Sequence, residues 1–314
     1  MTTTSHPSPV TLGVIGLGSM GLGAARSALR RGLATWGCDP QPAARAAFEQ
    51  AGGRAVLQPA ELAAHCDAVL VLVVNAAQTE AVLFGEHGLA QGLRPGAVVI
   101  ASATVDPALP PQWEARLAER GILFIDGPVS GGAKKAAEGQ MTVMASGSDA
   151  AFAAADAALS AIAGKVYRLG DRAGIGSTVK MVNQHLAGVH IASACEAMAL
   201  GMKAGADPRQ LYEVICHSAG MSWMFENRVP HILDGDYTPL SAVNIFVKDL
   251  GIVLDAARAL KFPLPLAAAA HQLYLATAAM GLGGEDDSAV VKYYATLAGL
   301  DLPEPAPQAS GAAA

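Results

Sequence analysis

The segment Gly16-Leu17-Gly18-Ser19-Met20-Gly21 has the spacing of a loop that binds the pyrophosphate of a dinucleotide. An apolar stretch precedes it and an Ala-rich stretch follows it, which is the strand, turn and helix context that this loop requires. Gly18 lets the backbone approach the phosphates, while the helix N-terminus offers unpaired N–H groups and the positive end of a dipole. A tight turn that binds nothing is the plain alternative, and the flanking pattern favours dinucleotide binding.

Asp39 lies 23 residues after Gly16, at the end of the next apolar stretch. A carboxylate at this place can bind the ribose diol of an adenosine. Pro40 follows it and no arginine stands nearby to bind a 2′-phosphate, so the sequence predicts NAD rather than NADP as the cofactor. A turn or helix-cap role for Asp39 is the alternative.

The segment from Asp126 to Gly132 follows a predicted strand and consists mainly of small residues. Ligands of open α/β sheets bind at the carboxyl ends of the strands. Consecutive small residues expose several N–H groups in a row, which suits the carboxylate of a small substrate. A plain loop explains the same residues equally well.

Two lysines stand in apolar surroundings. Lys180 and Asn183 lie three residues apart in a helical stretch, so a cation and an amide project from one face. A solvated surface lysine is the usual interpretation of such a position. Lys248 also lies among apolar residues, where a surface pair with Asp249 is the simplest interpretation.

Other common chemistries lack their sequence patterns. The histidines show no H-E-x-x-H or similar ligand spacing, and no G-x-S-x-G is present, so we expect neither a metal centre nor a serine nucleophile. The four cysteines, at positions 38, 66, 195 and 216, are scattered and form no C-x-x-C pair. They indicate free buried thiols rather than a disulfide framework or a zinc site.

Short β-branched runs alternate with Ala-rich stretches through the first half of the chain. The strand-like runs are 10–16, 34–38, 68–74, 97–101 and 122–126, and the helix-like stretches are 20–31, 43–51 and 79–83. Continuous apolar strands separated by helix lengths predict a parallel, doubly wound sheet, covered on both faces. We therefore expect an N-terminal Rossmann-type α/β domain over residues 9–172.

From about residue 173 the pattern becomes helical throughout. Long helical periodicity runs through 180–204, 209–217, 243–260 and 266–280, without strand-like alternation. This predicts an all-α domain over residues 173–302, in which Asp207-Pro208 begins one helix and Gly205 ends the one before. The tail 303–314, rich in proline and then Ala, Ser and Gly, is expected to be disordered.

Charge and hydropathy exclude several partners. The chain has 314 residues and a formal net charge of −6, from 21 Lys and Arg and 27 Asp and Glu. No block of like charge appears, so we expect no nucleic acid and no anionic membrane surface as a partner. The longest apolar run, 68–74, is far shorter than the roughly 20 residues that cross a bilayer, and the start lacks a signal-peptide pattern. These features predict a cytoplasmic protein.

Four segments together resemble the β-hydroxyacid dehydrogenase family, which includes 3-hydroxyisobutyrate dehydrogenase and tartronate semialdehyde reductase. They are 13–21, 126–132, Gly176-x-x-x-Lys180-x-x-Asn183 and Lys248-Asp249-Leu250, in the family's order and at its spacing. The resemblance covers about residues 10–302. The stretches 34–37, 177–180, 187–191, 222–227 and 234–239 look most like the branch that oxidises L-threonate.

The resemblance assigns roles by position. Lys180 matches the catalytic lysine. The positions that match substrate-binding residues are Ser130, Gly131, Gly132, Asn183 and Trp223. The positions that match cofactor-binding residues are the loop 16–21 (Gly16, Leu17, Gly18, Ser19, Met20 and Gly21), Asp39, Val74, Asn75, Thr104 and Lys248. Two residues depart from the family's pattern, because Ala103 replaces a common serine and Gln184 replaces a common asparagine.

The resemblance implies NAD-dependent oxidation of a small anionic hydroxy acid, with L-threonate oxidised to 2-dehydro-L-erythronate. Lys180 would take the hydroxyl proton, once burial or a nearby cation favours its neutral form. Alternatives of the same class are oxidation of 3-hydroxyisobutyrate and reduction of tartronate semialdehyde; a related imine reductase is disfavoured because those enzymes usually lack this lysine. A non-catalytic NAD-binding regulator is the alternative from another class. A homodimer or homotetramer through the helical domain is also expected.

Overall fold

The protein is described here by a computed structural model, which covers residues 10–305. The chain divides after Met181 into two compact units, and each is described by itself. The predicted domain start at residue 9, the N-terminal segment without a signal pattern, and residues 306–314 of the predicted disordered tail lie outside the described residues.

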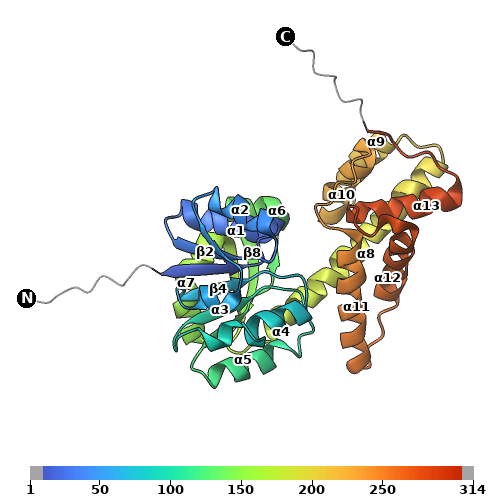
Figure 1. The fold of residues 1–314 in the computed structure, drawn as a ribbon. Coiled ribbons are helices and arrows are strands. Elements are labelled where there is room, and N and C mark those ends of the chain that lie inside the picture. Colours follow the sequence, from blue (N-terminus) through green and yellow to red (C-terminus); the bar gives the residue numbers. More distant parts are fainter. Residues whose placement is uncertain (1–9, 306–314) are drawn as a thin grey trace, which may run out of the picture. The chain divides into compact units, whose positions relative to one another are not determined.

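The first unit is built on one sheet, with the strand order β3-β2-β1-β4-β5-β6-β8-β7 and with β9 paired to β8 (Figure 1). Strands β1 to β6 run parallel to their neighbours. The order reverses between β1 and β4, which confirms the predicted doubly wound arrangement. The bounds are β1 Thr11–Ile15, β2 Ala34–Cys38, β3 Arg54–Val56, β4 Ala68–Val71, β5 Val98–Ala101 and β6 Leu123–Asp126.

Helices cover both faces of this sheet, because alternate residues of each strand face opposite sides. Leu12, Val14 and Leu70 belong to one apolar cluster, which includes the buried alanines of α1 and α7. Val69 and Val71 belong to the other, with the side chains of α5. The helices are α1 Ser19–Arg30, α2 Pro42–Glu49, α3 Pro59–Ala63, α4 Ala76–Phe84, α5 Pro110–Ala118, α6 Gly132–Glu138 and α7 Asp149–Ile162, with a 3₁₀ turn at Leu89–Gln91.

Three strands beyond β6 were not predicted: β7 Val129–Ser130, β8 Met141–Ser146 and β9 Ala163–Gly170. Strand β8 runs antiparallel to β6 and β7, and parallel to β9. The sheet is therefore mixed at this end rather than parallel throughout. Strand β9 is only partly buried and carries charged residues, so it lacks the continuous apolar character of the inner strands.

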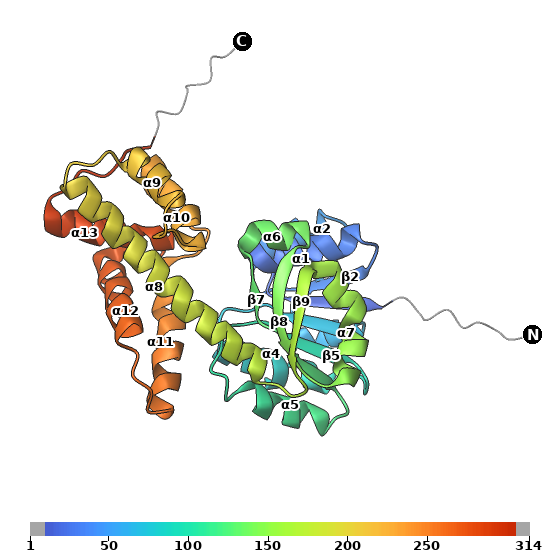
Figure 2. The same cartoon turned by 180° about the vertical axis from the view of Figure 1, so that it is seen from behind.

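The second unit is helical, as predicted. Helix α8 begins in the first unit and continues into the second, and Figure 2 shows it as one continuous helix. Gly205, at φ +89°, follows α8, and the Asp207 side chain caps the next helix by accepting from Gln210 N, with Pro208 in the first turn. Helices α10 and α13 were not predicted, and in α10 Pro230 interrupts the helical pattern. The helices are α8 Ile175–Lys203, α9 Pro208–Cys216, α10 Trp223–Asp234, α11 Val243–Ala259, α12 Pro265–Thr277 and α13 Val290–Ala298, with a π-type turn at Ala278–Leu282 and a 3₁₀ turn at Asp287–Ala289.

Candidate active site

The predicted phosphate loop connects β1 to α1, and its three glycines serve different purposes. Gly16 has φ +88°, and a Cβ on Gly21 would lie 1.7 Å from the carbonyl oxygen of Gly16, so both positions exclude a side chain for internal reasons. Gly18 has an ordinary φ of −64° and a Cβ there would meet nothing within 4 Å. Neither backbone strain nor packing explains Gly18. The space beside it suits the backbone approach of a dinucleotide pyrophosphate, so the loop fits the predicted cofactor.

Asp39 is buried at the carboxyl end of β2 and contacts this loop directly. Its Oδ2 accepts a hydrogen bond from Leu17 N at 2.7 Å, and its Oδ1 accepts from Gln41 N at 2.8 Å. The carboxylate thus stabilises both the glycine loop and the turn into α2. The turn role that was the alternative for Asp39 is therefore present. Ribose binding by the same carboxylate stays a prediction.

An arginine does lie beside Asp39, contrary to the sequence analysis. The Arg45 Nη1 donates to the carbonyl oxygens of Asp39 at 2.6 Å and Pro40 at 3.0 Å. Arg45 lies in α2, and the turn after β2 brings this helix back over the strand end. The expectation of NAD over NADP therefore rests on the Asp39 carboxylate rather than on the absence of a cation.

Three more predicted cofactor residues follow the carboxyl ends of β4 and β5. Val74 is 52% exposed and its N–H donates to Gln78 Oε1 at 2.8 Å. Asn75 caps α4, because its Oδ1 accepts from Gln78 N at 2.9 Å. Thr104 is partly buried three residues after β5. Strand β4 ends at Val71, so Val74 lies in the following loop rather than in a strand that continues to it.

The predicted carboxylate loop spans β7 and the start of α6. Gly131 has φ +128° and Gly132 has φ +69°, conformations that favour glycine. A Cβ on Gly131 would lie 2.8 Å from the side chain of Lys135, whose aliphatic part covers this glycine. A Cβ on Gly132 would meet nothing within 4 Å. Open space therefore lies beside Gly132, on the loop that includes Ser130.

Asp126 anchors the beginning of α8, a function that the sequence did not indicate. Its Oδ2 accepts from Ser177 N at 2.8 Å and from Gly174 N at 2.9 Å, and its Oδ1 accepts from Ser177 Oγ at 2.6 Å. Ser146 Oγ donates to Oδ2 at 3.4 Å. Burial raises the pKa of the Asp126 carboxyl, while the bonds from Ser177 and Gly174 oppose the rise.

The glycine of the Gly176-x-x-x-Lys180 segment is explained by this anchor. A Cβ on Gly176 would lie 2.4 Å from the Met144 carbonyl oxygen and 2.6 Å from that of Asp126. Helix α8 therefore begins against β6 and β8, and Lys180 lies one turn further along it. Lys180 is 7% exposed, so the interpretation as a solvated surface lysine was wrong.

A chain of polar contacts inside the helical unit links Asn183, Gln184, Asp249 and Lys248 in that order. Asn183 Nδ2 donates to Gln184 Oε1 at 3.0 Å, and Gln184 Nε2 donates to Asp249 Oδ2 at 2.5 Å. The other oxygen of Asp249 pairs with the Lys248 ammonium. The pair with Asp249 that the sequence suggested for Lys248 is present, but Asp249 is 2% exposed, so the pair is not on the surface.

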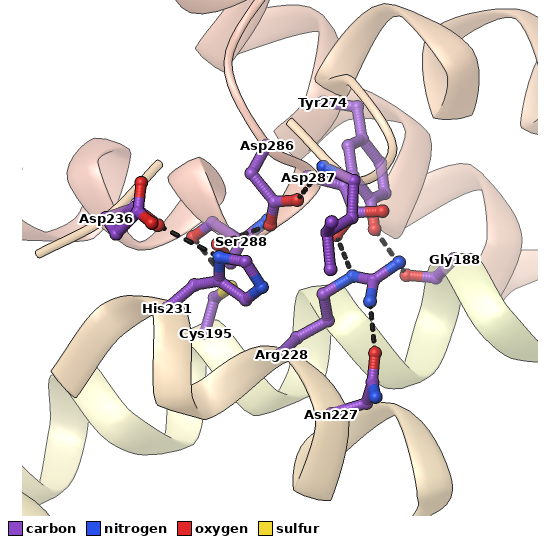
Figure 3. A network of polar contacts seen from close by, with 11 residues as sticks. Gly188, Cys195, Asn227, Arg228, His231, Asp236, Tyr274, Asp286, Asp287 and Ser288 are labelled. Atoms are coloured by element: carbon purple, nitrogen blue, oxygen red, sulfur yellow. Dashed lines mark hydrogen bonds and ion pairs between the residues drawn. The ribbon is translucent and has the colours of Figure 1, made fainter. Parts of the chain in front are cut away.

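Trp223, the remaining predicted substrate residue, is 57% exposed at the start of α10. In the same helix, Arg228 is buried. Its Nε donates to Asp287 Oδ1 at 2.7 Å and its Nη1 donates to Asn227 Oδ1, as Figure 3 shows. Burial raises the pKa of the Asp287 carboxyl to about 6, and the neighbouring Asp286 also raises it, against the opposing effect of Arg228. No local pattern signals this network, because Arg228 and Asp287 lie 59 residues apart in the chain.

All four cysteines are free, as predicted, but Cys216 is only partly buried. Cys38, Cys66 and Cys195 are buried and unpaired, and burial raises the pKa of the Cys38 and Cys66 thiols to about 12. Between residues 10 and 305 no cluster of three or more His, Cys, Asp or Glu side chains could hold a metal ion. No helix in the same range is both long and apolar enough to cross a bilayer.

Family models match both units. The model of the NAD binding domain of 6-phosphogluconate dehydrogenase matches residues 11–170, and that of the NAD-binding region of NADP-dependent 3-hydroxyisobutyrate dehydrogenase matches residues 174–294. The chain belongs to the β-hydroxyacid dehydrogenase family. It is therefore an NAD-dependent oxidoreductase that acts on a hydroxy acid, and the resemblance, enzyme class and cofactor inferred from the sequence are confirmed.

Individual relatives of this dehydrogenase cover almost its whole length. An L-threonate dehydrogenase of Cupriavidus necator is 61% identical over 93% of this chain and 97% of its own. The L-threonate dehydrogenase of Escherichia coli strain K12 is 54% identical over 93% of this chain and 96% of its own. A crystal structure of 3-hydroxyisobutyrate dehydrogenase from Salmonella typhimurium is 53% identical, with a TM-score of 0.86 over 90% of this chain and 99% of that one.

Proposed function

We propose that this dehydrogenase oxidises L-threonate at C2 to 2-dehydro-L-erythronate, with Lys180 as the general base. The observation that carries the catalytic part is the anchoring of α8 on Asp126, which fixes Lys180 one turn from the base of the carboxylate loop. The substrate is supported by five relatives named L-threonate dehydrogenase at 50–61% identity. The mitochondrial 3-hydroxyisobutyrate dehydrogenases of rat and human are only 30–31% identical, although the Salmonella typhimurium structure that bears this name is 53% identical.

Different loops of the first unit bind the cofactor and the substrate in this proposal. The loop 16–21 and Asp39 hold the dinucleotide, while the backbone N–H groups of Ser130, Gly131 and Gly132 hold the substrate carboxylate. When bound, NAD supplies the redox chemistry by accepting a hydride from the carbinol carbon. Val74, Asn75 and Thr104 follow neighbouring parallel strands and are proposed to line the same cofactor.

Lys180 takes the hydroxyl proton on its Nζ in this proposal. Burial disfavours a lysine ammonium relative to the neutral amine, and Lys180 is buried at the start of α8. A lysine that loses its proton near neutral pH is suited to general base catalysis, and in the reverse direction its ammonium donates the same proton. Lys248 is proposed to bind the cofactor, as the family resemblance implies.

Substrate discrimination is proposed to depend on side chains that satisfy the extra hydroxyls of L-threonate. Asn183, on the same helix as Lys180, and Trp223 are the proposed contacts. A site with polar groups for these hydroxyls disfavours an apolar acid, because those groups would stay unpaired. The name of the Salmonella typhimurium structure favours 3-hydroxyisobutyrate as the second candidate substrate.

The experiment is a substrate panel with both cofactors. L-threonate, D-threonate, L-erythronate, 3-hydroxyisobutyrate and glycerate are each offered with NAD and with NADP, and NADH or NADPH absorbance is followed. We expect the largest kcat/KM for L-threonate with NAD. A larger value for 3-hydroxyisobutyrate would transfer the assignment to the second candidate. No turnover of any hydroxy acid, with NAD still bound, would support a regulator instead.

Self-association through the helical unit and a cytoplasmic location are further parts of the proposal. Leu260, Phe262 and Leu266 are exposed around the turn between α11 and α12, and Leu200 and Leu297 are exposed on α8 and α13. These apolar side chains support a homodimer or homotetramer. Size-exclusion chromatography with light scattering tests this oligomeric state, and a monomer at micromolar concentration would contradict it. Free cysteines are typical of a reducing compartment, and cell fractionation tests the location.

A further inference from the structure

The contacts among Asn183, Gln184 and Asp249 have a direction that chemistry fixes. Gln184 is 8% exposed, and its side chain lies between the other two. A carboxylate only accepts hydrogen bonds, so Gln184 must turn its Nε2 toward Asp249. Its Oε1 then faces Asn183 and can only accept, so Asn183 must turn its Nδ2 toward Gln184.

The orientation of the Asn183 amide follows from this sequence of contacts. Free amides can bind with either end, since oxygen and nitrogen have similar shapes and only their hydrogen-bonding roles differ. Here the Nδ2 end is committed to Gln184, and Oδ1 remains for a donor. The Lys248 ammonium pairs with the second oxygen of Asp249, so each oxygen of this side chain accepts from a different donor.

We propose that Gln184 is a positioning residue for specificity: with Asp249 it orients the Asn183 amide so that Oδ1 accepts a hydrogen bond from a substrate hydroxyl other than the one that is oxidised. This inference rests on the proposed function and deepens it. The enzyme then favours acids that carry such a hydroxyl, because an acid with a methyl group at that place would cover the amide oxygen without offering it a hydrogen bond.

The test is the variant Gln184→Leu, which keeps most of the side-chain volume and removes both contacts. The Asn183 amide can then rotate, and one neutral hydrogen bond is worth about 0.5–1.5 kcal/mol, or roughly a 2- to 13-fold effect. We expect the kcat/KM ratio of L-threonate to 3-hydroxyisobutyrate to fall by about that factor, mainly through the KM for L-threonate. A variant that merely loosens the fold lowers both values of kcat/KM together.

Two further variants make the result decisive. In an Asn183→Ala background, Gln184→Leu should change the ratio no further, because Gln184 acts through Asn183. Tyr274→Phe is the matched control, since Tyr274 is buried in the same unit and its hydroxyl donates to the Gly188 carbonyl oxygen at 3.0 Å rather than to Asn183, Gln184 or Asp249. Its melting temperature should fall while the ratio stays at the wild-type value.

The outcomes also separate this inference from the proposed function. If wild-type protein oxidises L-threonate and Gln184→Leu leaves the ratio unchanged, the orientation by Gln184 is wrong and the proposed function stands. Additive effects of Gln184→Leu and Asn183→Ala on the ratio would overturn the proposal as well, because Gln184 would then not act through Asn183. If wild-type protein does not oxidise L-threonate, the proposed function itself fails.

Discussion

Replacing Asp126 by alanine should damage both the stability of the first unit and the rate of catalysis. Three donors, Ser177 N, Ser177 Oγ and Gly174 N, lie 2.6–2.9 Å from its carboxylate and would lose their partner inside the protein. Each buried donor left unsatisfied costs about 1–3 kcal/mol. Removing the carboxylate also relieves the desolvation that raises its pKa, so we expect the lower end, about 3 kcal/mol in all.

Asparagine at the same position should be far milder. Its oxygen can take the place of Oδ2 and accept from Ser177 N and Gly174 N, while its nitrogen donates to Ser177 Oγ, whose hydroxyl can rotate to accept. The loss is then about 1 kcal/mol, because charge-assisted bonds become neutral ones. The geometry of α8 is retained, and with it the position of Lys180.

Melting temperature, NAD titration and initial rates measure these effects on both variants. We expect Asp126→Ala to melt roughly 6–12 °C below wild type, at about 2–4 °C per kcal/mol. Below its melting range, its kcat should fall at least about 10-fold with NAD affinity nearly unchanged, since a displacement of about 1 Å can cost 100-fold. Asp126→Asn should retain most of the rate. An alanine variant with wild-type kcat, or an asparagine variant as slow as alanine, would refute the anchoring argument.

Three other substitutions test separate parts of the structure. Gly18→Ala should weaken NAD binding at least about 10-fold with little change in melting temperature, because the added Cβ enters the open space proposed for the pyrophosphate. Gly21→Ala should instead destabilise the fold by about 3 kcal/mol or more, because its Cβ would contact the Gly16 carbonyl oxygen. Calorimetry and NAD titration compare the two variants, and equal melting temperatures would contradict the reasoning. Asp39→Asn should reduce the kcat/KM preference for NAD over NADP at least about 10-fold, since the negative charge that repels a 2′-phosphate is gone, and an unchanged preference would show that Asp39 only braces the loop. The pKa of Asp287 in the folded state is raised from 3.8 to about 6, so the unfolded chain loses this proton first as pH rises. The unfolding free energy of wild type should therefore fall relative to that of Asp287→Asn by about 2 kcal/mol between about pH 4 and about pH 6; urea titrations at both pH values check it, and a constant difference would contradict it.

The parts of the fold that the sequence predicted are those that depend on local pattern. Strand β1, the glycine loop and α1 follow one another within 20 residues, so hydrophobic periodicity and turn chemistry are sufficient to predict them. Helix α10 was hidden by Pro230, and strand β9 by its charged, half-exposed residues. Strand β9 pairs with β8, and α10 packs against α8 and α9, so both elements are stabilised by tertiary contacts that their own sequences do not signal.

The candidate site shows the same division. Lys180 and Asn183 share a helix face, which three-residue spacing predicts. The contacts that position them join residues 48–51 apart for Asp126 and 65 apart for Gln184 and Asp249, and no local pattern signals them. Arg45 was not predicted to lie beside Asp39. The turn into α2 brings the Arg45 side chain back to the end of β2, and the spacing of the two residues does not indicate this turn.

The central claim, that Lys180 takes the proton while NAD accepts the hydride, is tested most directly by single-turnover NADH formation in Lys180→Ala. Protein saturated with NAD is mixed with L-threonate in a stopped-flow instrument, and NAD affinity is titrated separately. We predict a hydride-transfer rate lower by about 10²- to 10⁴-fold, with NAD affinity nearly unchanged and partial rescue by an added small primary amine. A variant that keeps most of the wild-type chemical rate would contradict the account, because the reaction would then proceed without its proposed base.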